Sequence, residues 1–384
     1  MEQNFDICVI GGGIQGAGIA QAAALSGLSV ALLEKSDWGA GTSSKSSKLI
    51  HGGLRYLQSF EFGLVRESLK ERRTLLNIAS DIVKPNWFYL PVYKNSQHKP
   101  WQLTVGLCLY RTLAGRKNLA GFKRVPRAQW KELNGLNTAN LKTVFAYQDA
   151  QTDDRLLTRR VALSAQAHGA TLFCPATVIS AEKTYKGYSV RLNLNGESKT
   201  IYCRTLVNAA GPWINPVANN ITPIPPIVDV DLVQGTHLEF KEQLSDQCFY
   251  LEAQQDHRAI FVMPYKGGTL LGTTEKVFSG NPDQVNPTPE EIEYLLEVIR
   301  YHFPHFNHKP IKAWAGLRVL PSGDKTPFSR SREVQYAESE SYLAVYGGKL
   351  TGYRATAETA IKKVIKSMGL EKRRKIQDSS KVKI

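Results

Sequence analysis

FDICVIGGGIQG, at residues 5–16, joins a short apolar run to a cluster of glycines. The run at 5–10 predicts a buried parallel strand, and the Ala- and Gly-rich residues 14–26 predict a helix that packs closely on it. A second apolar run at 28–34 ends in an acid. Together these parts predict a strand–helix–strand unit of roughly 30 residues, which is typical of an α/β fold.

The glycines have the spacing G-x-G-x-x-G at Gly11, Gly13 and Gly16, and Glu34 ends the next predicted strand. Gly11 permits a tight turn, Gly13 lets the backbone approach a pyrophosphate, and Gly16 lets helix and strand pack closely. The helix N-terminus would face the phosphates, and Glu34 would accept hydrogen bonds from ribose hydroxyls. Since an acid at this place disfavours a 2′-phosphate, the motif predicts a dinucleotide other than NADP.

Two further features favour FAD over NAD. A Ser-, Thr- and Gly-rich loop at 36–55 follows Glu34 directly, and such loops usually enclose something polar. Gly347 and Gly348 open the last predicted helix, whose N-terminus could stabilise negative charge on a reduced flavin ring. Helix starts with glycines at both ends of the chain suit a long cofactor.

The order of predicted elements indicates an α/β protein with a Rossmann-like FAD-binding domain of discontinuous segments and a second, mainly antiparallel-β substrate domain. The prolines within 85–101 indicate a break in regular structure. We expect the FAD-binding domain at 1–90, 145–221 and 315–370, the substrate domain at 91–144 and 222–314, and a frayed basic tail at 371–384. We predict helices at 62–79, 152–168, 289–301 and 351–367, and strands at 170–180, 187–193 and 199–208.

The composition argues against several classes of protein. Of 384 residues, 42% are hydrophobic and 22% charged, as in an ordinary globular chain. The five cysteines include no C-x-x-C pair, so we expect no disulfide framework and no Cys-rich zinc site, and a cytoplasmic location fits best. No signal peptide and no apolar run long enough to span a membrane is expected. We predict no metal site, and expect His302, His305 and His308 to be surface histidines.

The formal net charge of +15 indicates an anionic partner, such as nucleic acid, acidic lipid or a phosphorylated substrate. Cations flank the apolar stretch WQLTVGLCLY at 101–110 within the segment 99–127, and more cations gather at 362–384. This pattern fits an anionic membrane surface, although a core helix with solvated flanks fits it equally well. Nucleic acid is not expected, because neither stacking platforms nor a reader module is evident.

Four motifs resemble those of a known family, and the resemblance runs from about residue 4 to about residue 367. They are TSSKSSKLIHGGLRYL at 42–57, VNAAGPW at 207–213, WAGLRVLP at 314–321 and YGGKLTGYR at 346–354. The chain thereby resembles the FAD-dependent glycerol-3-phosphate dehydrogenases of the D-amino-acid-oxidase-like flavoproteins. This resemblance implies oxidation of sn-glycerol 3-phosphate to dihydroxyacetone phosphate, with electrons passing through FAD to membrane quinone. It also implies a peripheral position on the inner face of the cytoplasmic membrane, and a homodimer is a further expectation.

The sequence departs from the family's pattern in three places. Typical members continue into a C-terminal helical domain beyond the last motif, and Gly352 stands where many have a second threonine. In PFSRSREV at 327–334, either Arg330 or Arg332 could be the counterpart of the family's Ser/Thr-Arg pair. These departures leave the flavin site in place but leave the exact substrate open.

The resemblance implies a site for a phosphorylated alcohol. Arg55 and Arg318 would bind phosphate through their forked guanidinium groups, and Lys349 would add a point charge. His51 would act as the general base, and we count His51, Arg318 and Lys349 as catalytic. Hydrogen bonds to the substrate are expected from Tyr56 and Thr351.

The same resemblance implies further contacts with FAD, which we expect to be bound without a covalent bond. In addition to the glycines and Glu34, the expected contacts are Thr42, Ser43, Ser44, Ser47, Val178, Ala210 and Gly211. The serines would touch the phosphates or hold the loop, and Lys48 would shield the diphosphate or face solvent. Three alternatives stay open: a relative that passes electrons to dioxygen, one that oxidises a hydroxy acid or amine, and a catalytically silent flavin-binding paralogue.

Overall fold

The glycine-containing unit has the predicted topology in the computed structural model, which describes residues 3–115, 119, 121–323, 333–372 and 374–384. Strands β1 (Gln3–Ile10) and β2 (Val30–Leu33) are parallel, and α1 (Ile14–Leu25) connects them. Along β1, Ile7 and Val9 face a core beneath α1, whereas Cys8 and Ile10 face a second core. Successive strand residues point to opposite faces, so β1 is covered on both sides.

The first sheet is built around β1 and has nine strands in the described residues. Strands β1, β2, β7, β10 and β19 are joined in parallel, and β8, β9 and β10 form an antiparallel meander. Its other strands are β7 (Thr171–Phe173), β8 (Ala176–Thr184), β9 (Gly187–Leu194), β10 (Glu197–Asn208), β11 (Ile221–Thr222), β18 (Gln335–Ser339) and β19 (Tyr342–Tyr346).

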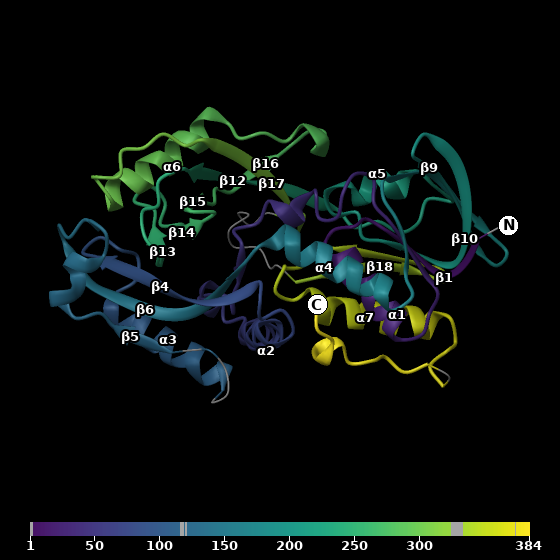
Figure 1. Cartoon of the computed structure of the whole chain (residues 1–384), viewed down its shortest axis with the longest axis horizontal. Coiled ribbons are helices and arrows are strands. Elements are labelled where there is room, and N and C mark those ends of the chain that lie inside the picture. Colours follow the sequence, from purple (N-terminus) through teal and green to yellow (C-terminus); the bar gives the residue numbers. More distant parts are fainter. Residues whose placement is uncertain (1–2, 116–118, 120, 324–332, 373) are drawn as a thin grey trace.

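Helices α1, α4 (Asp154–Ala167) and α7 (Tyr353–Ser367) cover one face of this sheet (Figure 1). A Cβ atom on Gly18 would lie 2.7 Å from the Tyr353 ring, so the small residues of α1 allow α7 to approach closely. The first and last helices of the chain are therefore side by side, and the short α5 (Ile214–Asn219) follows β10.

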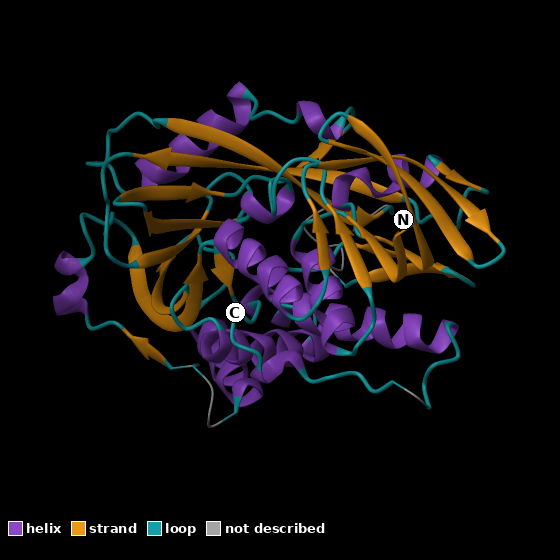
Figure 2. Cartoon of the chain, turned by 45° about the vertical axis from the view of Figure 1, so that its right-hand side comes forward, coloured by secondary structure: helices purple, strands orange, loops and turns teal. Residues whose placement is uncertain are grey.

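The second sheet has ten strands in the described residues and is antiparallel except for the pairing of β4 with β13 (Figure 2). Helix α6 (Pro289–His302) covers one face, while α2 (Phe62–Ile78) and α3 (Pro100–Ala114) pack on the other. Its strands are β3 (Leu49–Ile50), β4 (Val83–Tyr93), β5 (Phe122–Arg124), β6 (Leu141–Thr152), β12 (Val230–Phe240), β13 (Cys248–Glu252), β14 (Ala259–Tyr265), β15 (Gly268–Gly272), β16 (Lys276–Phe278) and β17 (Lys312–Pro321). The predicted α/β fold with a second, mainly antiparallel part is confirmed.

The expected break at 85–101 is confined to residues 94–99, between β4 and α3. Pro85 and Pro91 lie inside β4, and Pro100 is the first residue of α3. Strand β4 pairs with β6 along its whole length but with β13 only at Phe88 and Tyr89. Each end of β4 is thus a sheet edge on one side, where a residue without an N–H group is tolerated.

The expected domain limits at 90/91, 144/145 and 314/315 fall inside β4, β6 and β17. These strands continue through the limits because each pairs within the second sheet over its full length. The division into an FAD-binding and a substrate domain stays a proposal. Its limits should lie outside β4, β6 and β17.

The basic tail is not frayed where it is described, which corrects the expectation for 371–384. Ser379 is 2% exposed, and its hydroxyl accepts a hydrogen bond from Arg354 at 3.3 Å. The backbone N–H of Ile384 donates to the carbonyl of Ile78 at 3.0 Å, and Ile376 and Ile384 pack on the core beneath α1, α4 and α7. The apolar side chains within the charged tail hold it against α2 and α7.

Candidate active site

The glycine turn has the close packing that its motif predicts. Gly11 has φ of +107°, and a Cβ atom there would lie 2.6 Å from the carbonyl oxygen of Ala209. A Cβ atom on Gly16 would lie 1.9 Å from the carbonyl oxygen of Gly11, so larger residues cannot fit. Around Gly13 only the Ser43 hydroxyl comes close, at 3.2 Å from a built Cβ atom. The backbone of Gly13 thus borders open space at the start of α1.

Glu34 and Ser43 bind the glycine turn. The Glu34 carboxylate accepts a hydrogen bond from the Gly12 N–H at 2.8 Å, and the Ser43 hydroxyl accepts one from the Ile14 N–H at 2.9 Å. The backbone carbonyl of Glu34 also accepts from the N–H of Ala176, so β8 begins beside it. Val178 is two residues further along β8, close to the place where a ribose and adenine are expected.

The serines of the 36–55 loop have hydrogen bonds that hold the loop. Thr42 donates to the carbonyl of Leu317 at 2.6 Å, and Ser44 donates to the carbonyl of Ala40 at 3.1 Å. The Ser47 hydroxyl lies 3.0 Å from Nε2 of His237. Of the two predicted roles for these residues, the structure describes loop support, and contact with FAD stays a prediction.

Lys48 occupies neither of the places expected for it. Its side chain is 3% exposed, and its ammonium group donates to Asp154 and to the Ser44 carbonyl, each at 2.6 Å. Burial raises the pKa of Asp154, while the Lys48 charge opposes that rise. Lys48 therefore fixes the serine loop to the start of α4 instead of shielding a diphosphate or facing solvent.

The glycine pair near the C-terminus meets the start of α1. Gly347 and Gly348 have φ of +74° and +87°, and a Cβ atom on Gly348 would lie 2.4 Å from the Gln15 side-chain nitrogen. Both polar atoms of the Gln15 amide are buried and have no hydrogen-bond partner among the described residues. Ala210 and Gly211 follow β10 beside Gly11, and Gly211 has φ of +55°. Because buried amides require partners, this arrangement fits a long polar cofactor that passes both helix starts.

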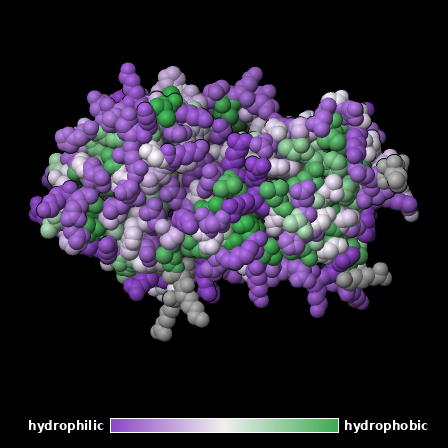
Figure 3. Space-filling model, viewed as in Figure 1, coloured by the Kyte–Doolittle hydropathy of each residue, from purple (hydrophilic) through white to green (hydrophobic). Residues whose placement is uncertain are grey.

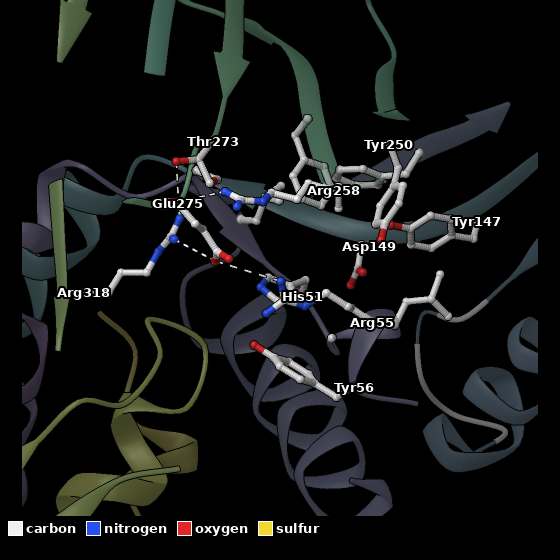
Figure 4. A pocket seen from close by; sticks show the side chains of 17 residues that line it. His51, Arg55, Tyr56, Tyr147, Asp149, Tyr250, Arg258, Thr273, Glu275 and Arg318 are labelled. Carbon is white, nitrogen blue, oxygen red and sulfur yellow. Dashed lines mark hydrogen bonds and ion pairs between the residues drawn. The ribbon is translucent and has the colours of Figure 1, made fainter. Parts of the chain in front are cut away.

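A cavity of about 120 Å³ lies between the serine loop and the second sheet (Figure 4). It is lined by four residues predicted to contact substrate or act in catalysis, His51, Arg55, Tyr56 and Arg318, and by Ser47, which was predicted to contact FAD. This volume is far below the ~300–1,000 Å³ of sites for drug-sized ligands, so it suits a small substrate.

The two other predicted substrate contacts adjoin the cavity. The Lys349 ammonium group lies 3.7 Å from the centroid of the Tyr56 ring, and the Thr351 hydroxyl accepts a hydrogen bond from the His51 N–H at 3.2 Å. The motifs at 42–57 and 346–354 thus meet at one place. Arg330 and Arg332 lie outside the described residues.

Three charged residues that line the cavity, Asp149, Arg258 and Glu275, were not predicted from the sequence. Glu275 accepts a hydrogen bond from Arg318 at 2.9 Å, and the same carboxylate oxygen lies 4.0 Å from Arg55. Arg258 also lines the cavity and donates to the Glu275 backbone carbonyl at 2.8 Å. Neither Glu275 nor Arg258 stands in a recognised motif, and only the pairing of the second sheet brings them to the arginines.

A buried network supports the turn after His51. The Gly52 N–H donates to the Tyr110 hydroxyl at 2.9 Å and to the Asp149 carboxylate at 3.2 Å. Tyr110 also donates to Asp149 at 2.9 Å, and Arg72 forms a buried ion pair with the same carboxylate. Burial raises the pKa of Asp149, and Arg72 opposes this. The network was not predicted, because its members are spread over α2, α3 and β6.

Two histidines behind the site are buried and neutral. His237 stacks on Trp314 with ring centroids 5.9 Å apart, and burial lowers its pKa well below the ordinary value. His302 was expected on the surface but is 0% exposed, and one ring nitrogen lies 2.9 Å from the Glu252 carbonyl. Burial lowers the pKa of His302 to about 4. The prediction that His302 lies on the surface is wrong, because it is on the side of α6 that faces the core.

The fold and the glycine cradle define the class of this protein, and comparison with known proteins agrees. Residues 6–360 match the model of the DAO family, described as FAD dependent oxidoreductase. The chain belongs to this family, and FAD is its cofactor. The fit rests on the glycine turn, on Glu34 and on the buried Gln15 amide.

The chain is similar to several relatives whose names specify a substrate. The chain is 37% identical to D-erythritol 1-phosphate dehydrogenase of Brucella abortus over 381 residues, which cover 96% of this chain and 75% of that protein. It is 36% identical to glycerol-3-phosphate dehydrogenase of Pseudomonas aeruginosa, covering 93% of this chain and 71% of that one. The structure of glycerol-3-phosphate dehydrogenase from Bacillus halodurans complexed with FAD superposes with a TM-score of 0.79 at 27% identity, covering 100% of this chain and 68% of that one.

Proposed function

We propose that this protein oxidises sn-glycerol 3-phosphate, or a close polyol phosphate, to the corresponding ketone phosphate. The observation that carries the proposal is the approach of Arg55 and Arg318 to one oxygen of Glu275, in the same cavity as His51. Guanidinium groups that approach one point form a suitable site for a phosphate dianion. The relatives that act on glycerol 3-phosphate and erythritol 1-phosphate support the same substrate class.

The residues divide the chemistry of alcohol oxidation between them. When bound, the flavin accepts a hydride from the carbon that carries the hydroxyl group. We propose that His51 takes the proton from that hydroxyl, and that Arg55 and Arg318 hold the phosphate. Lys349, above the ring of the cavity residue Tyr56, adds positive charge beside the cavity. The Thr351 hydroxyl and the Gly52 contacts hold the backbone of the base in place.

The alternative hypotheses for the substrate and for a catalytically silent protein have less support from the structure. A substrate with one carboxylate, such as an amino acid or hydroxy acid, needs fewer cations than Arg55, Arg258 and Arg318 provide. A catalytically silent paralogue has no use for a base beside a phosphate site. We propose membrane quinone as the electron acceptor, with dioxygen as the alternative, and self-association as a homodimer also stays a prediction.

The test of this function is anaerobic reduction of the bound flavin. We expect sn-glycerol 3-phosphate to bleach the flavin absorbance near 450 nm, because hydride transfer needs no external acceptor. The yellow protein is mixed with the substrate under argon, and the same concentration of inorganic phosphate serves as the control. Flavin that remains oxidised with every polyol phosphate tested would contradict the proposal, and reoxidation by quinone or by air then identifies the acceptor.

We propose a peripheral position on the cytoplasmic face of the membrane, with α3 as the contact. No helix among the described residues is long and apolar enough to cross a membrane. On α3, Trp101 is 68% exposed and Val105 is 59% exposed. Phe60, which lies just before the start of α2, is 77% exposed. The face seen in Figure 3 is largely hydrophilic, with separate hydrophobic areas. Exposed aromatic groups beside basic residues suit an anionic lipid surface.

We predict that the protein sediments with anionic vesicles at low salt and that Trp101→Ala reduces the bound fraction several-fold. The indole supplies apolar area that enters the headgroup region, whereas attraction by the net charge of +15 alone is screened by salt. Tyr185→Ala is the matched control, because Tyr185 is fully exposed on the β8–β9 hairpin. Absence of binding to anionic vesicles at low salt would exclude the membrane position.

A further inference from the structure

The active-site cavity has two chemically different ends. Arg318 and Glu275 lie on one side of His51, and Tyr147, Tyr250 and Asp149 lie on the other (Figure 4). A phosphate at the arginines and an alcohol carbon at His51 engage the first side only. The two tyrosines of the second side are therefore polar groups that the chemistry proposed above does not use.

Tyr147 is the more informative of the two tyrosines. It is on β6, its side chain is only 3% exposed, and it lines the cavity. Its ring is fixed between Phe88 and Tyr110, with centroids 5.6 and 6.3 Å away. Figure 4 shows its hydroxyl directed toward Tyr250 and Asp149. A phenol hydroxyl on a cavity wall can both donate a hydrogen bond to a ligand and accept one from it.

Tyr250 stands between Tyr147 and the cations. Its ring packs edge-on against Phe261 with centroids 5.2 Å apart, and it also lines the cavity. Burial raises the pKa of Tyr250 to about 12, and the charge of Arg55 acts against that rise. Burial likewise raises the pKa of Tyr147 well above its ordinary value. Both phenols are therefore neutral hydrogen-bond donors and acceptors at physiological pH.

We propose that Tyr147 and Tyr250 form a hydroxyl-binding subsite for a polyol phosphate with more than three carbons. This inference rests on the proposed function, since it places the phosphate at Arg55 and Arg318 and the oxidised carbon at His51. The hydroxyl group that such a substrate carries beyond the length of glycerol 3-phosphate then reaches the two phenols. Two neutral phenols suit neutral hydroxyls, whereas a second anionic group would meet the buried Asp149 carboxylate.

The proposal predicts selectivity for chain length. A site built to hydrogen-bond a substrate hydroxyl disfavours an analogue that lacks it, because the buried protein groups stay unpaired. We expect D-erythritol 1-phosphate to be used with kcat/KM at least ~10-fold higher than sn-glycerol 3-phosphate, because its one additional hydroxyl group can donate to one phenol and accept from the other. The same order is expected in dissociation constants measured by calorimetry with the enzyme kept oxidised.

The test compares three variants on both substrates. Tyr147→Phe and Tyr250→Phe each remove one hydroxyl while keeping the ring, and each should reduce the preference for the four-carbon substrate ~3- to 10-fold. Use of sn-glycerol 3-phosphate should change less than ~2-fold. Tyr202→Phe, on the antiparallel part of β10 away from the cavity lining, is the control and should leave both substrates unchanged. The flavin content of each variant, read from its absorbance, confirms that the fold is kept.

The outcomes separate this subsite from the function on which it rests. A wild-type enzyme that uses both substrates equally, or prefers the three-carbon one, overturns the subsite and leaves the proposed function in place. Equal losses on both substrates in the phenylalanine variants also overturn it. Failure of both compounds to reduce the flavin overturns the proposed function and the subsite together.

Discussion

Arg318→Ala is expected to lower kcat/KM for a polyol phosphate by roughly 30-fold to more than 1,000-fold, mainly through KM, while FAD stays bound. Removing one partner of a desolvated charge pair costs about 2–5 kcal/mol. The loss here has two sources, since the phosphate loses a guanidinium and Glu275, 6% exposed, keeps its negative charge in the cavity. Steady-state kinetics and the flavin absorbance of the purified variant measure both effects.

Two further variants serve as comparisons for Arg318→Ala. Arg318→Lys keeps the charge but loses the fork, so we expect it to recover only part of the affinity. Arg300→Ala is the control, because Arg300 forms an exposed ion pair with Glu293 on α6, and such pairs contribute little. An Arg318→Ala enzyme with unchanged KM would remove Arg318 from the phosphate site.

His51→Asn is expected to lower kcat by about 10²- to 10⁴-fold, the usual contribution of a general base. KM should change far less, because the phosphate contacts at Arg55 and Arg318 remain. Asparagine preserves much of the shape of the ring, and the His51 N–H bond to Thr351 belongs to the backbone. The rate of anaerobic flavin reduction, measured by stopped flow across a pH series, reports the chemical step directly.

The pH series provides the decisive comparison for His51. A base must be deprotonated to act, so wild-type reduction should slow as the pH falls, and the variant should lose that dependence. His168→Asn is the control, since His168 is exposed at the end of α4. If the variant keeps the wild-type rate and pH dependence, the base is another group.

The sequence predicted the parts of the site that depend on local constraints. Gly11 and Gly16 could be recognised because any Cβ atom there meets backbone, and such positions leave a short, regular motif. His51 and Arg55 stand in one loop whose composition already indicated a polar occupant. The strand and helix periodicities also predicted α2, α4, α6 and α7 closely.

The missed features depend on pairing between distant segments. Glu275 and Arg318 are 43 residues apart in sequence. They meet only because β16 and β17 both pair with β12. Pro85 and Pro91 appeared to interrupt a strand because the one-sided pairing of β4 has no local signal. The tail appeared disordered because its charges outnumber the few isoleucines that hold it in place.

The order of strands in the first sheet has a consequence for how the chain folds during synthesis and binds FAD. Strand β19 pairs with β10, and the Gly347–Gly348 turn after it meets Gln15 of α1, more than 330 residues earlier. During synthesis, the flavin site therefore cannot be completed until the last part of the sheet has left the ribosome. Contacts of such long range close slowly and leave sheet edges exposed meanwhile. We expect the nascent chain to depend on chaperones until residues 346–354 have emerged from the ribosome, and FAD to bind only after that.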